Sequence, residues 1–246
     1  MNLLIISGMD KNHDDQHVKA NCPFQHTFFE KVIKDQNPKY ITKVLRSYLV
    51  DINEFDFSHY DAFLWTGGLG NIYENNSHNK KQLEIFTKIV ELGKPIWGSC
   101  WGLQVFVTVL GGKITKSSIP EFGFANNIKI KNDHYIYRNK KDLFTAPGHH
   151  YDSVENIPND FKVISENDFS IQSIVHKKYN IICTQYHPEL PYNFIGNLMT
   201  YWKTNYLDKM TGEKFSELIH NLEQLENRDL YDRKLELVNW LNSLEN

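Results

Sequence analysis

Apolar and polar positions alternate in blocks along the first half of the chain. Short apolar or β-rich runs predict buried strands at 2–6, 41–50, 60–66 and 95–99. Between and after these strands, apolar residues recur at helical spacing in the segments 22–36, 80–94 and 101–112. Strands that alternate with helices are typical of a parallel sheet covered on both faces. The first half of the chain therefore predicts an α/β fold.

The middle of the chain follows another pattern, in which short β-rich runs are separated by polar turns. These runs lie at 112–118, 126–132, 161–167, 172–178 and 180–187. They predict an antiparallel or mixed extension of the sheet. From Pro191 onward the spacing of apolar residues is helical again. We therefore expect one domain over 1–205 and a C-terminal helical extension over 206–246 that packs on it.

Composition and charge narrow the possible functions. The 246 residues are 41% hydrophobic and 23% charged, which is ordinary for a globular domain, and the net charge is −3. A chain of this charge is not expected to offer the broad basic surface that binds nucleic acid. No stretch approaches the roughly 18 apolar residues of a membrane span, and no cationic residue precedes the apolar start as in a signal peptide. Three cysteines make no disulfide framework, so we expect a cytoplasmic protein.

Cys100 stands between two glycines where a predicted strand meets a predicted helix. The sequence GSCWGLQ (98–104) has the form small–x–nucleophile–x–small, with Gly98 and Gly102 as the small residues. We expect these glycines to tolerate strained dihedral angles and to let a substrate carbonyl approach the backbone. The N-terminus of a helix also favours a thiolate. The motif alone leaves one alternative open, a buried thiol that only fills space.

A base for this cysteine is present near the end of the last predicted strand. His187 follows the β-rich run NIICTQY, and Glu189 stands two residues later, across a proline. Because strand ends meet at one edge of a parallel sheet, His187 is expected to reach Cys100. Glu189 can then bind the other ring nitrogen and fix the tautomer of the imidazole.

The turn TGGLG (66–70) offers backbone donors that no side chain covers. The N–H of Gly68, together with the N–H of Trp101, predicts an oxyanion hole. No Lys-Ser/Thr pair follows the turn, and the spacing is not G-x-G-x-x-G, so neither a Walker-type phosphate loop nor a dinucleotide site is predicted. The pair His149-His150 lacks a third ligand at metal-binding spacing, so no metal is expected.

In this order, the three motifs resemble the class I (triad-type) glutamine amidotransferase family. Its signature is a TGG turn, a G-x-C-x-G-x-Q elbow and a late H-P-E, and the match covers roughly residues 1–200. The branch that it resembles most is the glutaminase domain of GMP synthetase, in a stand-alone form. The resemblance implies a flavodoxin-like, three-layer fold: a mainly parallel twisted sheet flanked by helices, with a mixed or antiparallel extension.

The same resemblance implies a role for each matching residue. Cys100 would be the nucleophile, His187 the general base and then acid, and Glu189 the residue that orients it. Residues implied to bind substrate are Gly67, Gln104, Glu121, Gly123, Phe124 and His150. In GMP synthetase a Ser-His-Gly-Asp stretch matches HHYDSV (149–154), with His150 and Asp152 as counterparts. Tyr151 departs from the glycine of that stretch, so the role of this loop stays open.

The activity that the resemblance implies is hydrolysis of the glutamine side-chain amide through a γ-glutamyl thioester, without metal or organic cofactor. The first hypothesis is a glutaminase that passes ammonia to a separate synthetase subunit, because no synthetase-like segment is expected in this chain. The second is a stand-alone hydrolase or transferase of a γ-glutamyl amine or peptide. The third is a binding or regulatory module whose cysteine is idle. A homodimer is also considered.

Overall fold

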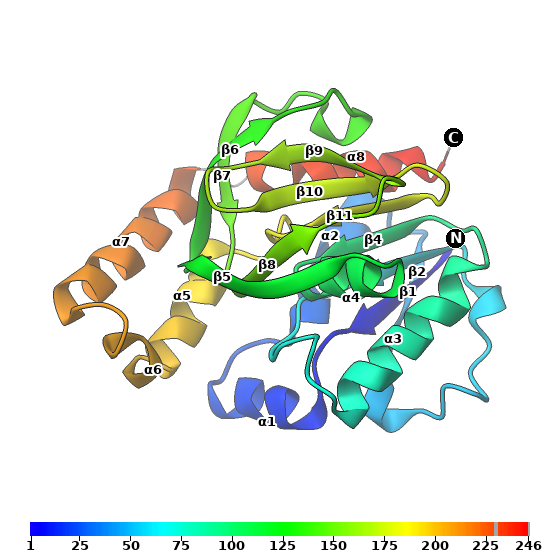
Figure 1. The fold of residues 1–246 in the computed structure, drawn as a ribbon, viewed down its shortest axis with the longest axis horizontal. Helices are drawn as coiled ribbons and strands as arrows, with labels where there is room; N and C mark the ends of the chain where they lie inside the picture. The colour runs from blue at the N-terminus through cyan, green and yellow to red at the C-terminus, as the bar shows by residue number, and fades with distance from the viewer. Residues whose placement is uncertain (229–230, 246) are drawn as a thin grey trace.

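A nine-stranded twisted sheet forms the middle layer of the protein in the computed structural model, which describes residues 1–228 and 231–245 (Figure 1). One half is parallel, in the order β2 (Ile41–Arg46), β1 (Asn2–Ser7), β3 (Ala62–Trp65), β4 (Ile96–Ser99) and β11 (Ile181–Thr184). The other half is antiparallel: β10 (Ile171–His176), β9 (Phe161–Glu166), β6 (Phe124–Ile130) and β7 (Leu143–Pro147). The predicted parallel sheet with an antiparallel extension is confirmed.

A separate two-stranded sheet pairs β5 (Lys113–Glu121) with β8 (His150–Asn156). The expected run at 112–118 therefore forms a strand outside the main sheet. Neither β7 nor β8 was expected from the sequence. The burial of β7 does not alternate, and in β8 the alternating buried positions are His150, Asp152 and Val154, so neither strand shows an alternation of apolar residues.

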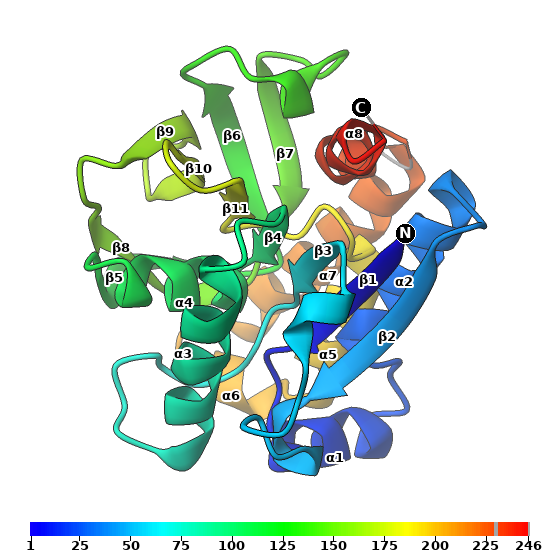
Figure 2. The ribbon, with the colours of Figure 1, turned by 90° about the vertical axis from the view of Figure 1, so that its right-hand side faces the viewer.

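Helices cover both faces of the main sheet (Figure 2). On one face, α3 (Ser77–Val90) and α4 (Trp101–Val109) contribute Phe86 and Phe106 to a core that includes Leu4 of β1. On the other face, α2 (Gln25–Gln36) and α8 (Leu235–Ser243) contribute Phe29 and Trp240. Successive β1 residues point to opposite faces, and both faces are covered, so the whole run from Leu3 to Ile6 is buried.

Four further helices lie around one end of the parallel strands. They are α1 (Lys11–Lys19), α5 (Tyr192–Tyr201), α6 (Thr204–Leu207) and α7 (Gly212–Arg228). Apolar side chains of α5 and α7 pack against each other in a cluster of their own. The C-terminal segment thus divides, since α7 packs on α5 while α8 packs beneath the sheet. Short 3₁₀ turns complete the fold at Ser47–Leu49, Phe57–His59, Tyr135–Tyr137 and Asp232–Lys234.

Helix α1 is the helix that the apolar pattern did not predict. Its sequence KNHDDQHVK has almost no apolar face. A local cap signal was present, because the Asp10 side chain accepts a hydrogen bond from the His13 backbone N–H at 2.8 Å. The helices that the apolar pattern predicted do form, although α2 begins at Gln25 rather than at residue 22.

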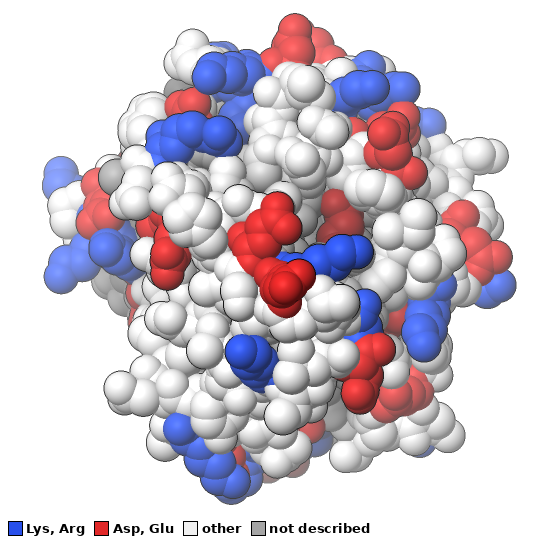
Figure 3. Space-filling view, turned by 90° about the vertical axis from the view of Figure 1, so that its left-hand side faces the viewer, with Lys and Arg blue, Asp and Glu red and all other residues white. Residues whose placement is uncertain are grey.

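The surface matches the low net charge. Lysine, arginine, aspartate and glutamate side chains are intermingled over the face in Figure 3, without a broad area of one sign. Among the described residues, none of the helices has the length and apolar character needed to cross a membrane.

Candidate active site

Cys100 occupies a sharp turn between β4 and α4. Its backbone has φ 50° and ψ −94°, a conformation that L-residues rarely adopt and that costs roughly 1–3 kcal/mol. Its N–H donates to the carbonyl of Thr184 at 2.7 Å, which ties the turn to the end of β11. The side chain therefore stands at the edge of the sheet where the parallel strands end.

The neighbouring glycines act through packing, which differs from what the motif predicted. Neither Gly98 nor Gly102 has a positive φ; the strain lies on Cys100 itself. A Cβ on Gly98 would stand 2.6 Å from Cε2 of Phe106, and one on Gly102 would stand 2.8 Å from Cβ of Trp65. The two glycines thus let α4 pack closely on the strands and hold the turn in its strained form.

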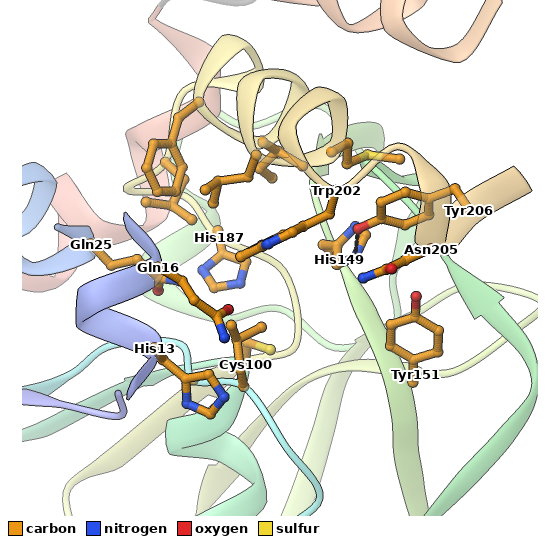
Figure 4. A pocket seen from close by; sticks show the side chains of 17 residues that line it. His13, Gln16, Gln25, Cys100, His149, Tyr151, His187, Trp202, Asn205 and Tyr206 are labelled. Carbon is orange, nitrogen blue, oxygen red and sulfur yellow. Dashed lines mark hydrogen bonds between the residues drawn. The ribbon is translucent and has the colours of Figure 1, made fainter. Parts of the chain in front are cut away.

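His187 lies against Cys100, and Glu189 lies on its far side. Cys100 and the imidazole line the same cavity (Figure 4). Nδ1 of the imidazole is 2.7 Å from Oε1 of Glu189. All three side chains are buried, with at most 5% of each residue exposed. Burial opposes a charge on His187, but Glu189 and Cys100 outweigh it and raise the pKa of His187 to about 10.

The TGG turn lies directly over these residues. A Cβ on Gly67 would stand 2.5 Å from Cε1 of His187. One on Gly68 would stand 2.7 Å from Cγ of Trp101 and 2.5 Å from the Gly8 carbonyl oxygen. Glycines were expected here because they leave backbone N–H groups uncovered. The contacts add a second reason for glycine, since neither position has room for a side chain. Trp101 is held beneath the turn by Gln82, whose Oε1 accepts from its Nε1 at 3.2 Å.

Two cavities meet at Cys100. A smaller one, of about 140 Å³, includes Gln104, His150 and Asp152 in its wall. A larger one, of about 290 Å³, includes His187 in its wall (Figure 4). Both cavities also touch Gly68, Leu69, His149 and Tyr151. Cys100 thus borders both cavities.

The wall of the larger cavity comes mostly from residues that the sequence analysis missed. Gln16 and His13 reach in from α1, while Tyr206 and Asn205 of α6 lie on the opposite side (Figure 4). Trp202, at the C-terminal end of α5, extends between these two sides. No motif marked these residues, because they come from three helices that meet only in the folded chain. A cap signal at Asp10 was the one available indication of α1.

His149 joins the two cavities and is an uncharged group. Burial lowers its pKa to about 3, and His150 and His187 act in the same direction. Its Nε2 lies 3.1 Å from the hydroxyl oxygen of Tyr206. The backbone N–H of Gly123 donates to its Nδ1 at 3.4 Å, so Nε2 carries the proton and donates to Tyr206.

Three of the residues implied to bind substrate lie at the site: Gly67 lies against His187, and Gln104 and His150 line the smaller cavity. Glu121 is buried behind His150 and lines neither cavity at Cys100. Its Oε2 is 2.9 Å from Nε2 of His150 and accepts from Nε2 of Gln172 at 2.6 Å. Burial opposes its charge, but His150, Asn167 and Ser170 outweigh burial and lower the pKa of Glu121. Gly123 and Phe124 belong to the wall of neither cavity at Cys100 among the described residues.

Comparison with known proteins identifies the family to which this site belongs. The family model of class-I glutamine amidotransferases matches residues 14–199. The chain is a member of the class-I glutamine amidotransferase family. Members of the family are amide hydrolases. Among the described residues, no group of three or more His, Cys, Asp or Glu side chains is arranged to hold a metal ion.

Relatives of this amidotransferase differ in how much of their length it matches. A "GMP synthase [glutamine-hydrolyzing]" from Plasmodium falciparum is 27% identical over 210 residues, which are 72% of this chain and 38% of that protein. A "Gamma-glutamyl-L-1-hydroxyisopropylamide hydrolase" from a Pseudomonas species is 27% identical over 249 residues, covering 88% of this chain and 83% of the relative. A glutamine amidotransferase structure from Thermotoga maritima superposes with a TM-score of 0.73 at 19% identity, over 99% of this chain and 97% of that one. The last likeness confirms the fold.

Proposed function

We propose that this amidotransferase hydrolyses the side-chain amide bond of glutamine or of a γ-glutamyl amide through a thioester on Cys100. The observation that carries the proposal is the position of His187, which lines the same cavity as Cys100 and has its Nδ1 2.7 Å from Oε1 of Glu189. A nucleophile, a base and an orienting carboxylate in this arrangement are the components of a catalytic triad. The idle-cysteine hypothesis gives no reason for such an arrangement.

The attack begins with His187 protonated, because Glu189 and Cys100 raise its pKa to about 10. In this proposal Cys100 attacks as a thiolate, which is the nucleophilic form of a cysteine. The thiolate adds to the amide carbonyl carbon, and the negative charge moves to the carbonyl oxygen. In this proposal the N–H groups of Gly68 and Trp101 bind that oxygen. An oxyanion donor contributes about 3 kcal/mol to such a step.

Collapse of this intermediate breaks the carbon–nitrogen bond. The Nε2 proton of His187 passes to the departing nitrogen, which leaves as ammonia or an amine. Water then attacks the thioester while His187 takes its proton, and the released glutamate carries the new carboxyl oxygen. The imidazolium and thiolate are restored. The balance is amide plus water to glutamate plus amine, and the chain needs no further reactant.

The smaller cavity is suited to the γ-glutamyl group. Oε1 of Gln104 is buried there without a hydrogen-bond partner among the described residues, so it is available to accept from an α-ammonium group. The Asp152 carboxylate lies in the same wall, where Oδ1 accepts from the Tyr73 hydroxyl at 3.2 Å. We further infer that Glu121 acts through His150, which it holds at 2.9 Å, rather than by touching substrate.

A second function is favoured by the GMP synthase relatives, in which the matched segment is only part of the protein. Here the chain would release ammonia to a separate synthetase subunit. The same thioester chemistry serves both functions. They differ in what leaves the carbonyl and in whether a partner protein is needed. A homodimer is compatible with either.

The proposal is tested by covalent labelling with the glutamine-like electrophile 6-diazo-5-oxo-norleucine. We expect mass spectrometry to find one adduct per chain, on Cys100, and hydrolysis of γ-glutamyl amides to be lost in Cys100→Ala. Cys183→Ala is the matched control, since Cys183 is buried in β11 and burial raises its thiol pKa well above the ordinary value. An adduct that persists in Cys100→Ala would overturn the proposal.

A further inference from the structure

The larger cavity lies on the side of Cys100 from which a leaving group must depart. His187, the proton donor of the proposed reaction, lines the larger cavity, whereas Gln104 and Asp152 line only the smaller one. A carbonyl attacked between them directs its nitrogen toward the acid and its acyl chain away from it. Resting on the proposed function, we propose that the larger cavity binds the amine portion of a γ-glutamyl amide, and that this amine carries an uncharged apolar substituent.

The size of the cavity exceeds what ammonia needs. A water-sized molecule requires roughly 10–15 Å³ measured in this way, and ammonia is of that size. The larger cavity measures about 290 Å³. A site that binds only glutamine would leave nearly all of this space without a ligand. The volume therefore matches an amine with several carbon atoms.

The chemistry of the wall selects an apolar substituent. Successive turns of α5, and the residue that follows it, line the cavity with apolar or aromatic side chains. These are Phe194, Ile195, Leu198, Met199 and Trp202. Most of these side chains are buried, and they also pack against α7. Binding an alkyl or aryl group here removes apolar surface from water on both molecules. Helix α5 thus forms the surface that the amine substituent would contact.

Charge in and near the cavity disfavours a second cation on the amine. None of the described residues in its wall is an aspartate or glutamate. Lys209 lies close by, with Nζ 4.4 Å from the centre of the Tyr151 ring and 3.0 Å from its hydroxyl. A diamine substrate would lose the hydration of its free ammonium group without gaining an anionic partner. A neutral substituent avoids this loss.

A buried polar atom near His187 is available for the amide nitrogen itself. Oε1 of Gln25 lines the cavity, is buried and has no hydrogen-bond partner among the described residues. It lies on the same side of the TGG turn as His187, since a Cβ on Gly67 would meet Oε1 of Gln25 at 2.7 Å and Nε2 of His187 at 3.3 Å. Gln25 can therefore accept the N–H of the scissile amide and direct its nitrogen toward His187.

A matched pair of substrates separates size from charge. The pair is γ-glutamyl-n-pentylamide and γ-glutamyl-4-aminobutylamide, which differ only in a terminal methyl or ammonium group; glutamine supplies the smallest leaving group. Since one methylene in an apolar pocket is worth about tenfold or more in kcat/KM, we expect the pentylamide to exceed both others by at least about tenfold. Equal or better hydrolysis of glutamine, or of the aminobutylamide, would overturn the inference.

Two variants test the wall directly. Asn205→Asp adds one negative charge at the rim with almost no change of shape, and we expect it to raise kcat/KM for the aminobutylamide relative to the pentylamide by about fivefold. Asn159→Asp, on the exposed turn between β8 and β9, is the control for net charge.

Trp202→Ala should reduce pentylamide hydrolysis about tenfold more than glutamine hydrolysis. Leu207→Ala, at the exposed end of α6 and outside the cavity wall, is the control for the removal of a large apolar side chain. Unchanged preferences in both cavity variants contradict the inference.

Failure of this inference can be told apart from failure of the proposed function. Labelling of Cys100 by 6-diazo-5-oxo-norleucine requires the nucleophile and the acyl site but no large amine. Labelling together with a preference for glutamine leaves the proposed function standing and overturns the amine site. Absence of labelling, with no hydrolysis of any of the three amides, overturns both.

Discussion

Ser99 donates a hydrogen bond from Oγ to Oε2 of Glu189 over 2.9 Å. Ser99 is the last residue of β4 and directly precedes Cys100. Through this bond it holds the carboxylate that faces His187. The indole N–H of Trp97 donates to the same serine oxygen at 3.1 Å. The three groups are buried, so the chain of hydrogen bonds is shielded from competing water.

The first prediction concerns this serine. Ser99→Ala leaves one oxygen of a buried carboxylate without its donor, and a hydrogen bond to a charged group is worth about 1.5–3 kcal/mol. We expect kcat/KM to fall about tenfold or more and its pH dependence to shift, because Glu189 then holds His187 less firmly. Ser216→Ala, on the exposed surface of α7, is the matched control. An unchanged pH profile would show that Ser99 has only a packing role.

The second prediction is a shift of the alkaline limb in Glu189→Gln. His187 must be an imidazolium to protonate the leaving nitrogen, so activity should decline as pH rises through its pKa of about 10. Removing the carboxylate charge lowers this pKa and moves the decline to lower pH. Profiles of kcat/KM across neutral and alkaline pH measure the shift. A limb that stays in place would mean that another group controls it.

The same substitution carries a prediction for stability. In the folded protein the pKa of His187 lies above its ordinary value of 6.5, so the folded state binds the proton more tightly than the unfolded state. This contribution is complete below about 6.5, decreases above that pH and is lost as pH passes about 10. The stability difference between wild type and Glu189→Gln should therefore shrink at alkaline pH. Urea unfolding at several pH values tests the sign.

The third prediction uses the close approach of the TGG turn. In Gly67→Ala the new Cβ would stand 2.5 Å from Cε1 of His187 and must displace the ring. Because small displacements in an active site can cost about 100-fold, we expect a loss of that size in kcat/KM and in the rate of Cys100 labelling. Gly212→Ala is the control, since a Cβ there meets nothing within 4 Å. Equal effects of the two substitutions would contradict the contact.

The fourth prediction concerns the attachment of α8 beside the site. Glu236 of α8 accepts from the Tyr186 hydroxyl at 2.8 Å and pairs with Lys140 at 3.0 Å, and all three side chains are buried. Glu236→Ala leaves the buried Lys140 without an anionic partner, so we expect a loss of about 3–5 kcal/mol in the free energy of unfolding. Adding Lys140→Met should restore a large part of it. Urea denaturation of the single and double variants measures this coupling.

The sequence by itself determined the core elements and the residues to which we assign the proposed chemistry. β1 and β4 were predictable because a central strand buried on both faces must be apolar throughout, and α3 because its apolar residues recur with the helical period. The grouping of Cys100, His187 and Glu189 was predictable because the proposed chemistry restricts both the residue types and their positions after strands. These signals are local, so they can be seen without the fold.

Tertiary structure alone decided the two cavities and the support of the triad. No pattern in the sequence indicated that the wall of the larger cavity would include Gln16, Gln25 and Trp202, since contacts between distant helices leave no periodic signal. It also assigned the strain to the glycines around Cys100, whereas packing against Phe106 and Trp65 transfers it to the cysteine. In our proposal, the bond that is cleaved follows from short motifs that can be read along the chain. The amine that we propose beside it depends on side chains that only folding brings together.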